Sequence, residues 1–222
     1  MPSHGSPLNK NHGVAVAVVV LAVLMLPFPL VPGSIPATSD AGVGEGGSSP
    51  SPLLTDPPIV IGSDADLVSQ AASNGWPGDG SKDDPFIISG YSINGTEARF
   101  CIYAKDVSYH MVISDNHLVN ASIKKGDPNT PKETGIMVER CTNVTIKNNL
   151  VANISKTTTI GGYGIVVRES SARVENNTIV NVLDGMLIIY SHSEVVDNTI
   201  LETTNDGLII GRGTTGFAVG NE

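Results

Sequence analysis

The sequence repeats one short pattern four times, and this repeat limits the folds open to the chain more than any other feature. Each copy begins with a glycine, then an apolar residue, any residue and a second apolar residue. An asparagine follows 13 or 14 residues after the glycine. The copies begin at Gly135, Gly164, Gly185 and Gly207, and a fainter copy begins at Cys101. The last three glycines lie 21 and 22 residues apart, a period typical of one coil of a β-solenoid.

Alternating apolar residues predict three inward-facing strands per coil, because residues two apart in a strand lie on the same side. The first pair of columns is predicted at Ile136 and Val138, Ile165 and Val167, Met186 and Ile188, and Leu208 and Ile210. A second column is predicted at Ile113, Ile146, Val174 and Val195, and a third at Leu118, Val151, Ile179 and Ile200. Three strands per coil predict a triangular cross-section, with coils about 4.8 Å apart.

The polar residues of the repeat predict where the coils bend. One ladder of side-chain amides is expected at Asn116, Asn149, Asn177, Asn198 and Asn221, since asparagine amides bond one another and asparagine tolerates left-handed backbone. A second bend column is expected at Asn120, Asn153 and Asn181, and it is broken by Glu202. The repeat glycines are expected at another bend, where positive φ or a close approach is easiest without a Cβ.

Composition divides the chain into four segments. They are residues 1–41, a signal peptide or N-terminal membrane anchor; residues 42–58, a flexible Gly-, Ser- and Pro-rich linker; residues 59–84, an N-terminal cap of a strand, a short helix and a loop; and residues 85–222, the parallel β-helix. The helix is expected to begin at Ser63 or Asp64 and to stop at Asn74 and Gly75. Because the last coil has no cap, we expect a fragment of a longer protein, self-association, or another chain at that coil.

An uncharged apolar run at residues 14–26 predicts export, so we expect a protein that is secreted or held on the extracellular face of a membrane. Export makes five Asn-x-Ser/Thr triplets candidates for glycosylation, at Asn94, Asn120, Asn143, Asn153 and Asn176. It also allows Cys101 and Cys141 to pair, although their repeat positions do not show whether they meet. The formal net charge of −9 argues against nucleic acid as a partner.

The repeat resembles that of the right-handed parallel β-helix superfamily, which includes pectate lyase-like enzymes and NosD-like exported proteins. The likeness covers about residues 85–221, and its most specific copy runs from Gly164 to Asn181. The opening from Asp83 to Ile93 is similar to the first coil of archaeal secreted β-helix proteins. The resemblance implies an all-β solenoid with a short N-terminal helix. It implies no single activity, because one fold serves many functions.

A polysaccharide lyase or uronate epimerase is one alternative. The resemblance implies an acidic sugar as its substrate, whose carboxylate is neutralised by Ca²⁺ or a basic side chain while a base removes the adjacent proton. Asp184 and Asp206 are weak candidates for catalysis or for a shared Ca²⁺, since each precedes a repeat glycine and the two are one coil apart. An exposed row adds the candidates Arg140, Glu169, Tyr190, Arg212 and His192. Asp-Gly is also ordinary turn chemistry, and no lyase signature is present.

The likeness to NosD also invites a copper interpretation. The soft donors are Met111, Met137, Met186, Cys101, Cys141, His110, His117 and His192. They form no His-x-His, Met-x-x-Met or clustered-cysteine motif, so the sequence does not favour copper and predicts no cofactor. We therefore expect a non-catalytic surface or carbohydrate-contacting module whose partner is a polysaccharide or cell-surface glycan. The lyase or epimerase and a NosD-like copper-associated protein remain the alternatives.

Overall fold

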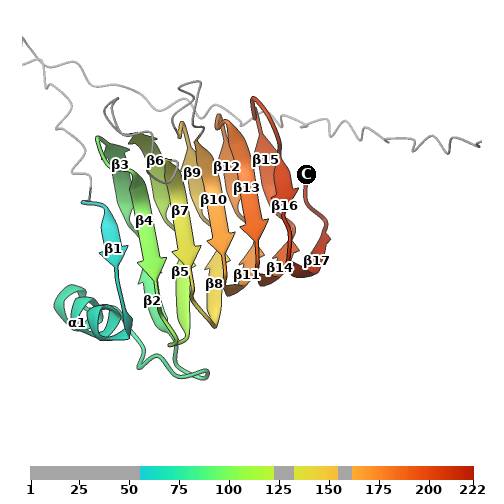
Figure 1. Cartoon of the computed structure of the whole chain (residues 1–222). Helices are drawn as coiled ribbons and strands as arrows, with labels where there is room; N and C mark the ends of the chain where they lie inside the picture. Colours follow the sequence, from blue (N-terminus) through green and yellow to red (C-terminus); the bar gives the residue numbers. More distant parts are fainter. Residues whose placement is uncertain (1–55, 123–132, 155–161) are drawn as a thin grey trace, which may run out of the picture. The chain divides into compact units, whose positions relative to one another are not determined.

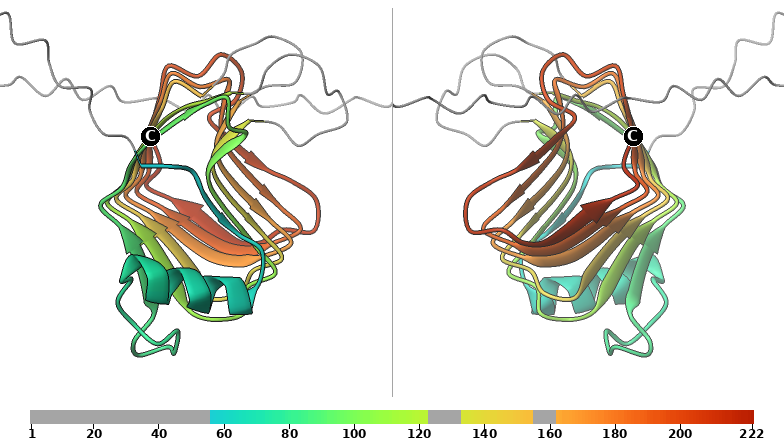
Figure 2. Two further views of the ribbon diagram at one scale, coloured as in Figure 1. Left: turned by 90° about the vertical axis from the view of Figure 1, so that its left-hand side faces the viewer. Right: turned by 90° about the vertical axis from the view of Figure 1, so that its right-hand side faces the viewer.

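The computed structural model describes residues 56–122, 133–154 and 162–222, which form a three-sided solenoid of parallel strands (Figures 1 and 2). Successive coils contribute strands to each of three sheets. This arrangement confirms the right-handed parallel β-helix expected from the repeat. The predicted signal peptide or anchor, and the linker as far as residue 55, lie outside the described residues. No helix in the described ranges is long and apolar enough to cross a membrane.

Three sheets run along the solenoid axis. The first contains β1 (Ile59–Ile61), β4 (Phe100–Lys105), β7 (Thr134–Glu139), β10 (Tyr163–Arg168), β13 (Asp184–Ile189) and β16 (Leu208–Ile210). The second contains β2 (Phe86–Ser89), β5 (Met111–Ser114), β8 (Val144–Lys147), β11 (Ser171–Glu175), β14 (His192–Val196) and β17 (Thr215–Val219). The third contains β3 (Ser92–Thr96), β6 (His117–Ser122), β9 (Leu150–Ala152), β12 (Thr178–Val180) and β15 (Thr199–Leu201). Residues one coil apart in sequence are therefore neighbours within a sheet.

One helix, α1 (Asp64–Asn74), lies at the N-terminal end of the solenoid (Figure 1). The Ser63 side chain accepts a hydrogen bond from the Asp66 amide, and Gly75 ends the helix with left-handed backbone. The Asp64 carboxylate accepts hydrogen bonds of 2.6 Å from the amide and the hydroxyl of Ser108. Partial burial opposes ionisation, but these bonds lower the pKa of Asp64. The carboxylate thereby connects the helix to the segment between β4 and β5.

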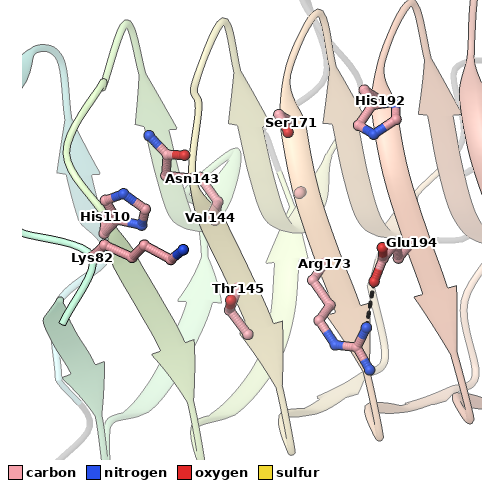
Figure 3. Close-up of a pocket in the computed structure, with 10 residues that line it drawn as sticks. Lys82, His110, Asn143, Val144, Thr145, Ser171, Arg173, His192 and Glu194 are labelled. Carbon is pink, nitrogen blue, oxygen red and sulfur yellow. Dashed lines mark hydrogen bonds and ion pairs between the residues drawn. The ribbon is translucent and has the colours of Figure 1, made fainter. Parts of the chain in front are cut away.

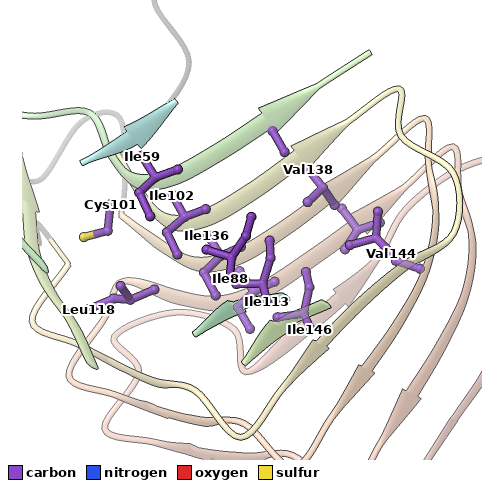
Figure 4. Close-up of a cluster of buried hydrophobic side chains, with 14 of the residues drawn as sticks. Ile59, Ile88, Cys101, Ile102, Ile113, Leu118, Ile136, Val138, Val144 and Ile146 are labelled. Atoms are coloured by element: carbon purple, nitrogen blue, oxygen red, sulfur yellow. The ribbon is translucent and has the colours of Figure 1, made fainter. Parts of the chain in front are cut away.

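The core is a stack of the apolar columns that the repeat predicted (Figure 4). Ile136, Ile165 and Met186 pair in register across β7, β10 and β13, and all three are fully buried. The second-sheet column contains Ile88, Ile113, Ile146, Val174 and Val195, and the third-sheet column contains Ile93, Leu118, Val151, Ile179 and Ile200. These columns confirm the inward faces predicted from the repeat, and they determine which side chains of each strand face solvent.

The repeat glycines were predicted to lie at a bend, and this prediction was wrong. Gly135, Gly164 and Gly185 lie inside β7, β10 and β13, and Gly207 directly precedes β16; none of the four has positive φ. A Cβ on Gly164 would lie 2.5 Å from the Ile179 Cγ2 atom and 2.6 Å from the Gly185 carbonyl oxygen. Close approach between a first-sheet strand and the third-sheet column is therefore what requires glycine here.

An asparagine ladder follows the bend between the second and third sheets, as predicted. Its members are Asn116, Asn149, Asn177, Asn198 and Asn221. The Nδ2 atom of each of the first four members donates to the Oδ1 atom of the next at 2.9 to 3.0 Å. The left-handed backbone at this bend belongs instead to the preceding residues, Asp115, Asn148, Asn176 and Asp197, with φ between 52 and 57°. The ladder positions are thus occupied by asparagine for their amides, and the expected backbone role was wrong.

Most of the asparagines in the predicted glycosylation triplets have left-handed backbone. Asn120, Asn143, Asn153 and Asn176 have positive φ, and Asn94 lies in β3. Asparagine adopts left-handed backbone more readily than most residues. Turn geometry therefore accounts for asparagine at four of these positions, and glycosylation stays a prediction.

Cys101 and Cys141 are free and fully buried. The Cys101 Sγ atom lies 3.6 Å from the Val119 carbonyl oxygen, whereas the Cys141 Sγ atom lies 3.5 Å from the Ala104 carbonyl oxygen. Burial raises the pKa of the Cys101 thiol to about 12 and also raises the pKa of Cys141. Because little thiolate forms near neutral pH, we expect neither thiol to react with Ellman's reagent in the native protein. Both should react in denaturant without reductant; no reaction there would show a disulfide and contradict the structure.

Apolar side chains are exposed on the last coil. Leu201, Ile210, Phe217 and Val219 are each about half exposed, between 49 and 56 %. Leu208 is partly buried against the core. Such a surface is able to pack against another chain or a further coil. A partner at this coil stays a prediction.

Candidate functional site

A shallow groove of about 510 Å³ lies over the outer face of the second sheet (Figure 3). It is lined by Lys82, His110, Asn143, Val144, Thr145, Ser171, Ala172, Arg173, His192 and Glu194. These residues come from the loop before β2, from the bends before β5 and β8, and from β8, β11 and β14. Thr145, Arg173 and Glu194 are paired in register on neighbouring strands. The groove therefore crosses successive coils of the solenoid.

Strand alternation explains why these side chains face outward. In β11, Ala172 and Val174 are buried in the core, whereas Ser171, Arg173 and Glu175 are only partly buried. The outer row beside them contains His110, Asn143, Ser171 and His192, one from each successive coil. Parallel strands lie about 4.8 Å apart, so this row spans three spacings, or about 14 Å.

Arg173 is held between two carboxylates at one end of the groove. Its Nε atom lies 2.6 Å from Glu175 Oε2, and its Nη1 atom donates to Glu194 Oε2. Hydrogen bonds to Glu175 and then to Glu194 raise the pKa of Arg173. Two carboxylates therefore share one guanidinium at this end of the groove, and Lys147 lies in register beside Glu175.

Lys82 lies at the other end, in a tight loop before β2. Asp79 Oδ1 accepts a hydrogen bond of 2.9 Å from the Ser81 amide, and the Gly80 carbonyl accepts one of 2.9 Å from the His110 amide. These bonds fix the loop against the second coil, and the Lys82 side chain points along the groove beside His110 (Figure 3). Within the described ranges, Lys82 forms no ion pair and no side-chain hydrogen bond.

Two hydroxyls in the middle of the groove are available to a ligand. The Thr145 and Ser171 side chains have no hydrogen bond to any described residue. Their neighbours are already engaged: Asn143 Nδ2 donates to the Ser108 carbonyl at 3.1 Å, and His192 Nδ1 lies 2.9 Å from Thr215 Oγ1. Polar groups thus occur in successive rungs, and some of them have no competing partner among the described residues.

Asp184 and Asp206, the predicted carboxylate pair, lie away from this groove. Asp184 begins β13 on the first sheet and is buried, and its Oδ1 atom accepts a hydrogen bond of 3.3 Å from the Asp206 amide. The Asp206 residue itself is exposed. The Asp184 side chain therefore connects two coils by binding a main-chain amide, and a role of the two carboxylates in catalysis or Ca²⁺ binding stays a prediction.

The predicted exposed row follows the bend between the first and second sheets. Arg140, Glu169 and Tyr190 have φ values of 49, 49 and 52°, and the Tyr190 amide donates to the Arg212 carbonyl at 3.0 Å. These residues share a backbone role at successive bends. His192 differs from them, because it is the member of the predicted set that lines the groove.

Ion pairs occupy two charged members of this row, Arg140 and Glu169. Arg140 donates from Nε and Nη2 to the Asp106 carboxylate at 2.7 and 3.1 Å, and these hydrogen bonds lower the pKa of Asp106. Arg168 Nε lies 3.2 Å from Glu169 Oε1. The pairs are at least one-third exposed, so they favour a solvated bend over a catalytic cluster.

Sequence reasoning missed several residues that line the groove. They are Lys82, Asn143 as a lining residue, Thr145, Ser171, Arg173 and Glu194. The available signal was strand alternation: Thr145, Arg173 and Glu194 each directly precede a core residue of the second sheet, so each had to face outward. Lys82 carried no such signal, because its position depends on how a loop folds against another coil.

The soft donors considered for copper do not converge. Met111 and Met186 are buried in core columns, and His110 and His192 lie about 14 Å apart by the rung spacing. Imidazole nitrogens bind a metal at about 2 Å, so these two cannot share one ion. Across the described part of the chain, no three His, Cys, Asp or Glu side chains are grouped to hold a metal. The His, Cys, Asp and Glu side chains of the described residues therefore do not form a preformed metal site.

Comparison with known proteins identifies a family that this chain matches. No curated protein and no solved structure matches this chain. A family model described as "Periplasmic copper-binding protein (NosD)" matches residues 60–222. This range includes the described helix and every described strand, apart from Ile59 at the start of β1. The match covers more than half of the chain and supports an extracytoplasmic location. The chain therefore belongs to the NosD family of parallel β-helix proteins.

Proposed function

We propose that this chain is an exported β-helix module that contacts polysaccharide through the second-sheet groove and does not cleave it. The observation that carries the proposal is the row of polar side chains on successive rungs, with the Thr145 and Ser171 hydroxyls unpaired among the described residues. A linear glycan presents hydroxyl groups at regular intervals along its length. An extended ligand of about 14 Å would meet all four rungs of the row.

The shape of the groove supports a polymer over a small molecule. Small-molecule sites are enclosed and mostly apolar, whereas this groove is shallow and lined mainly by polar side chains. A polymer is able to lie in an open groove without threading through an entrance. Each hydrogen bond contributes only about 0.5–1.5 kcal/mol, so useful affinity requires several rungs to act together.

The charges of the groove support binding without chemistry. Glu194 is the carboxylate that lines it within the described residues, and Glu194 is paired with Arg173. Cleavage of a glycosidic bond ordinarily uses two carboxylates on either side of the bond. The described lining of the groove supplies one carboxylate and not two.

Retention on immobilised polysaccharides tests this proposal. Thr145→Val removes a hydroxyl with little change in shape, and we expect affinity for a retained glycan to fall about three- to tenfold. Thr178→Val is the matched control, because it removes the same hydroxyl from the third sheet, outside the groove. Equal retention of both variants would contradict the groove assignment. Unsaturated product, followed by absorbance with and without Ca²⁺, would contradict a purely binding role.

A further inference from the structure

We infer that the groove selects carboxylated polysaccharides, and that Lys82 is the residue that confers this selectivity. The inference rests on the proposed function and adds the ligand class and its orientation. Lys82 lies at one end of the groove, and the Arg173–Glu194 pair lies at the other. One end therefore has a positive charge that is unpaired among the described residues, whereas the other end has a paired one. A neutral glycan would gain no ionic contact from this difference.

The Lys82 ammonium is available to an anion. Among described residues it has no ionic partner, although Asp83 and Asp84 follow it in sequence. Lys147, on the outer face of β8, also has no ion pair among the described residues, but Lys82 is the lysine that lines the groove. A ligand carboxylate would complete the missing pair, and a charge-assisted hydrogen bond is stronger than a neutral one.

The opposite end of the groove does not favour an anion. Arg173 already donates to both Glu175 and Glu194, so its one positive charge is paired with two carboxylates. A second carboxylate placed there would meet two like charges. The Glu194 carboxylate oxygens are instead able to accept hydrogen bonds from the hydroxyl groups of a sugar. The ligand is thus expected to place a carboxylate at Lys82 and hydroxyl groups toward Glu194.

The loop geometry keeps Lys82 in this position. The Gly80 carbonyl bonds the His110 amide, and a Cβ on Gly80 would lie 2.7 Å from both the Phe86 and Tyr109 rings. Those rings pack edge to face with their centroids 5.9 Å apart. The loop therefore rests on a packed aromatic pair, so the backbone that carries Lys82 is already ordered before a ligand binds.

Affinity measurements on the full 222-residue chain test the inference. Polygalacturonate, alginate and hyaluronate are each compared with the carboxyl-reduced form of the same polymer. We expect wild-type protein to prefer at least one acidic form about three- to fivefold, and to lose this preference as salt is raised. Lys82→Gln should abolish the preference. Lys105→Gln is the matched control, because it removes the same charge from β4, where Lys105 pairs with Asp106 at 3.9 Å.

The outcomes separate this inference from the proposed function. Retention of acidic and reduced polymers to the same extent would overturn the selectivity while leaving glycan binding intact. An equal loss in the Lys82 and Lys105 variants would show a general charge effect and would also overturn it. Absence of retention on every polymer would overturn the proposed function itself. A preference lost only with Lys82→Gln would support both.

Discussion

Replacing Asn177 with alanine is expected to lower the free energy of unfolding by about 3–4 kcal/mol. The Asn177 side chain accepts from the Asn149 amide and side chain, and it donates to Asn198 and to the Ile146 carbonyl. All of these groups are buried. Alanine would leave several of them without a partner, and each unsatisfied buried group costs about 1–3 kcal/mol. Urea denaturation followed by circular dichroism measures the change.

The neighbouring residue provides the control. Asn176 is exposed and has φ of 53°, a conformation that glycine adopts without strain. Asn176→Gly should therefore change stability by less than about 0.5 kcal/mol. Similar losses for the two variants would mean that the bend itself, and not the amide ladder, sets the stability of this corner.

Replacing Gly164 with alanine is expected to cost about 2–3 kcal/mol or to prevent folding. The new Cβ would lie 2.5 Å from Ile179 Cγ2 and 2.6 Å from the Gly185 carbonyl oxygen. The carbonyl belongs to the hydrogen-bonded sheet and cannot move away without distorting the pairing of β10 with β13. Thermal unfolding monitored by circular dichroism should show a clearly lowered midpoint.

Gly207 is the matched control within the same glycine column. The nearest atom to a Cβ at this position is Ile200 Cγ2, at 4.0 Å, which is ordinary van der Waals contact. Gly207→Ala should therefore be neutral or slightly stabilising, because alanine restricts the unfolded chain more than glycine does. A large loss for Gly207→Ala would show that backbone conformation matters at this column, as the sequence first suggested.

Much of the fold could be predicted because the repeat samples each structural position several times. Ile146, Val174 and Val195 are ordinary residues singly, but their common spacing identified one inward column. The role of the glycines could not be predicted in the same way. A glycine column is compatible with a bend or with a close approach, and only the distance to Ile179 and its equivalents distinguishes them.

The candidate site was much less accessible from sequence. Outward residues such as Arg173 face solvent, so no packing constraint makes them recur from coil to coil. Lys82 reaches the groove through the contact of its loop with His110, and this contact joins segments that the repeat does not relate. The residues singled out from the sequence were mostly those that hold bends, such as Asp184 and Tyr190, because bends recur as regularly as the core.

The asparagine ladder forms a row of aligned amide dipoles along the solenoid axis. One side-chain N–H of each of Asn116, Asn149, Asn177 and Asn198 points to the next coil, while the Asn116 Oδ1 atom accepts from the Tyr91 amide at the N-terminal end. Strand dipoles in a sheet largely cancel, whereas these amide dipoles add head to tail and polarise one another. As with an α-helix, the two ends of such a row attract opposite charges, but here the positive end lies toward the C-terminal coil.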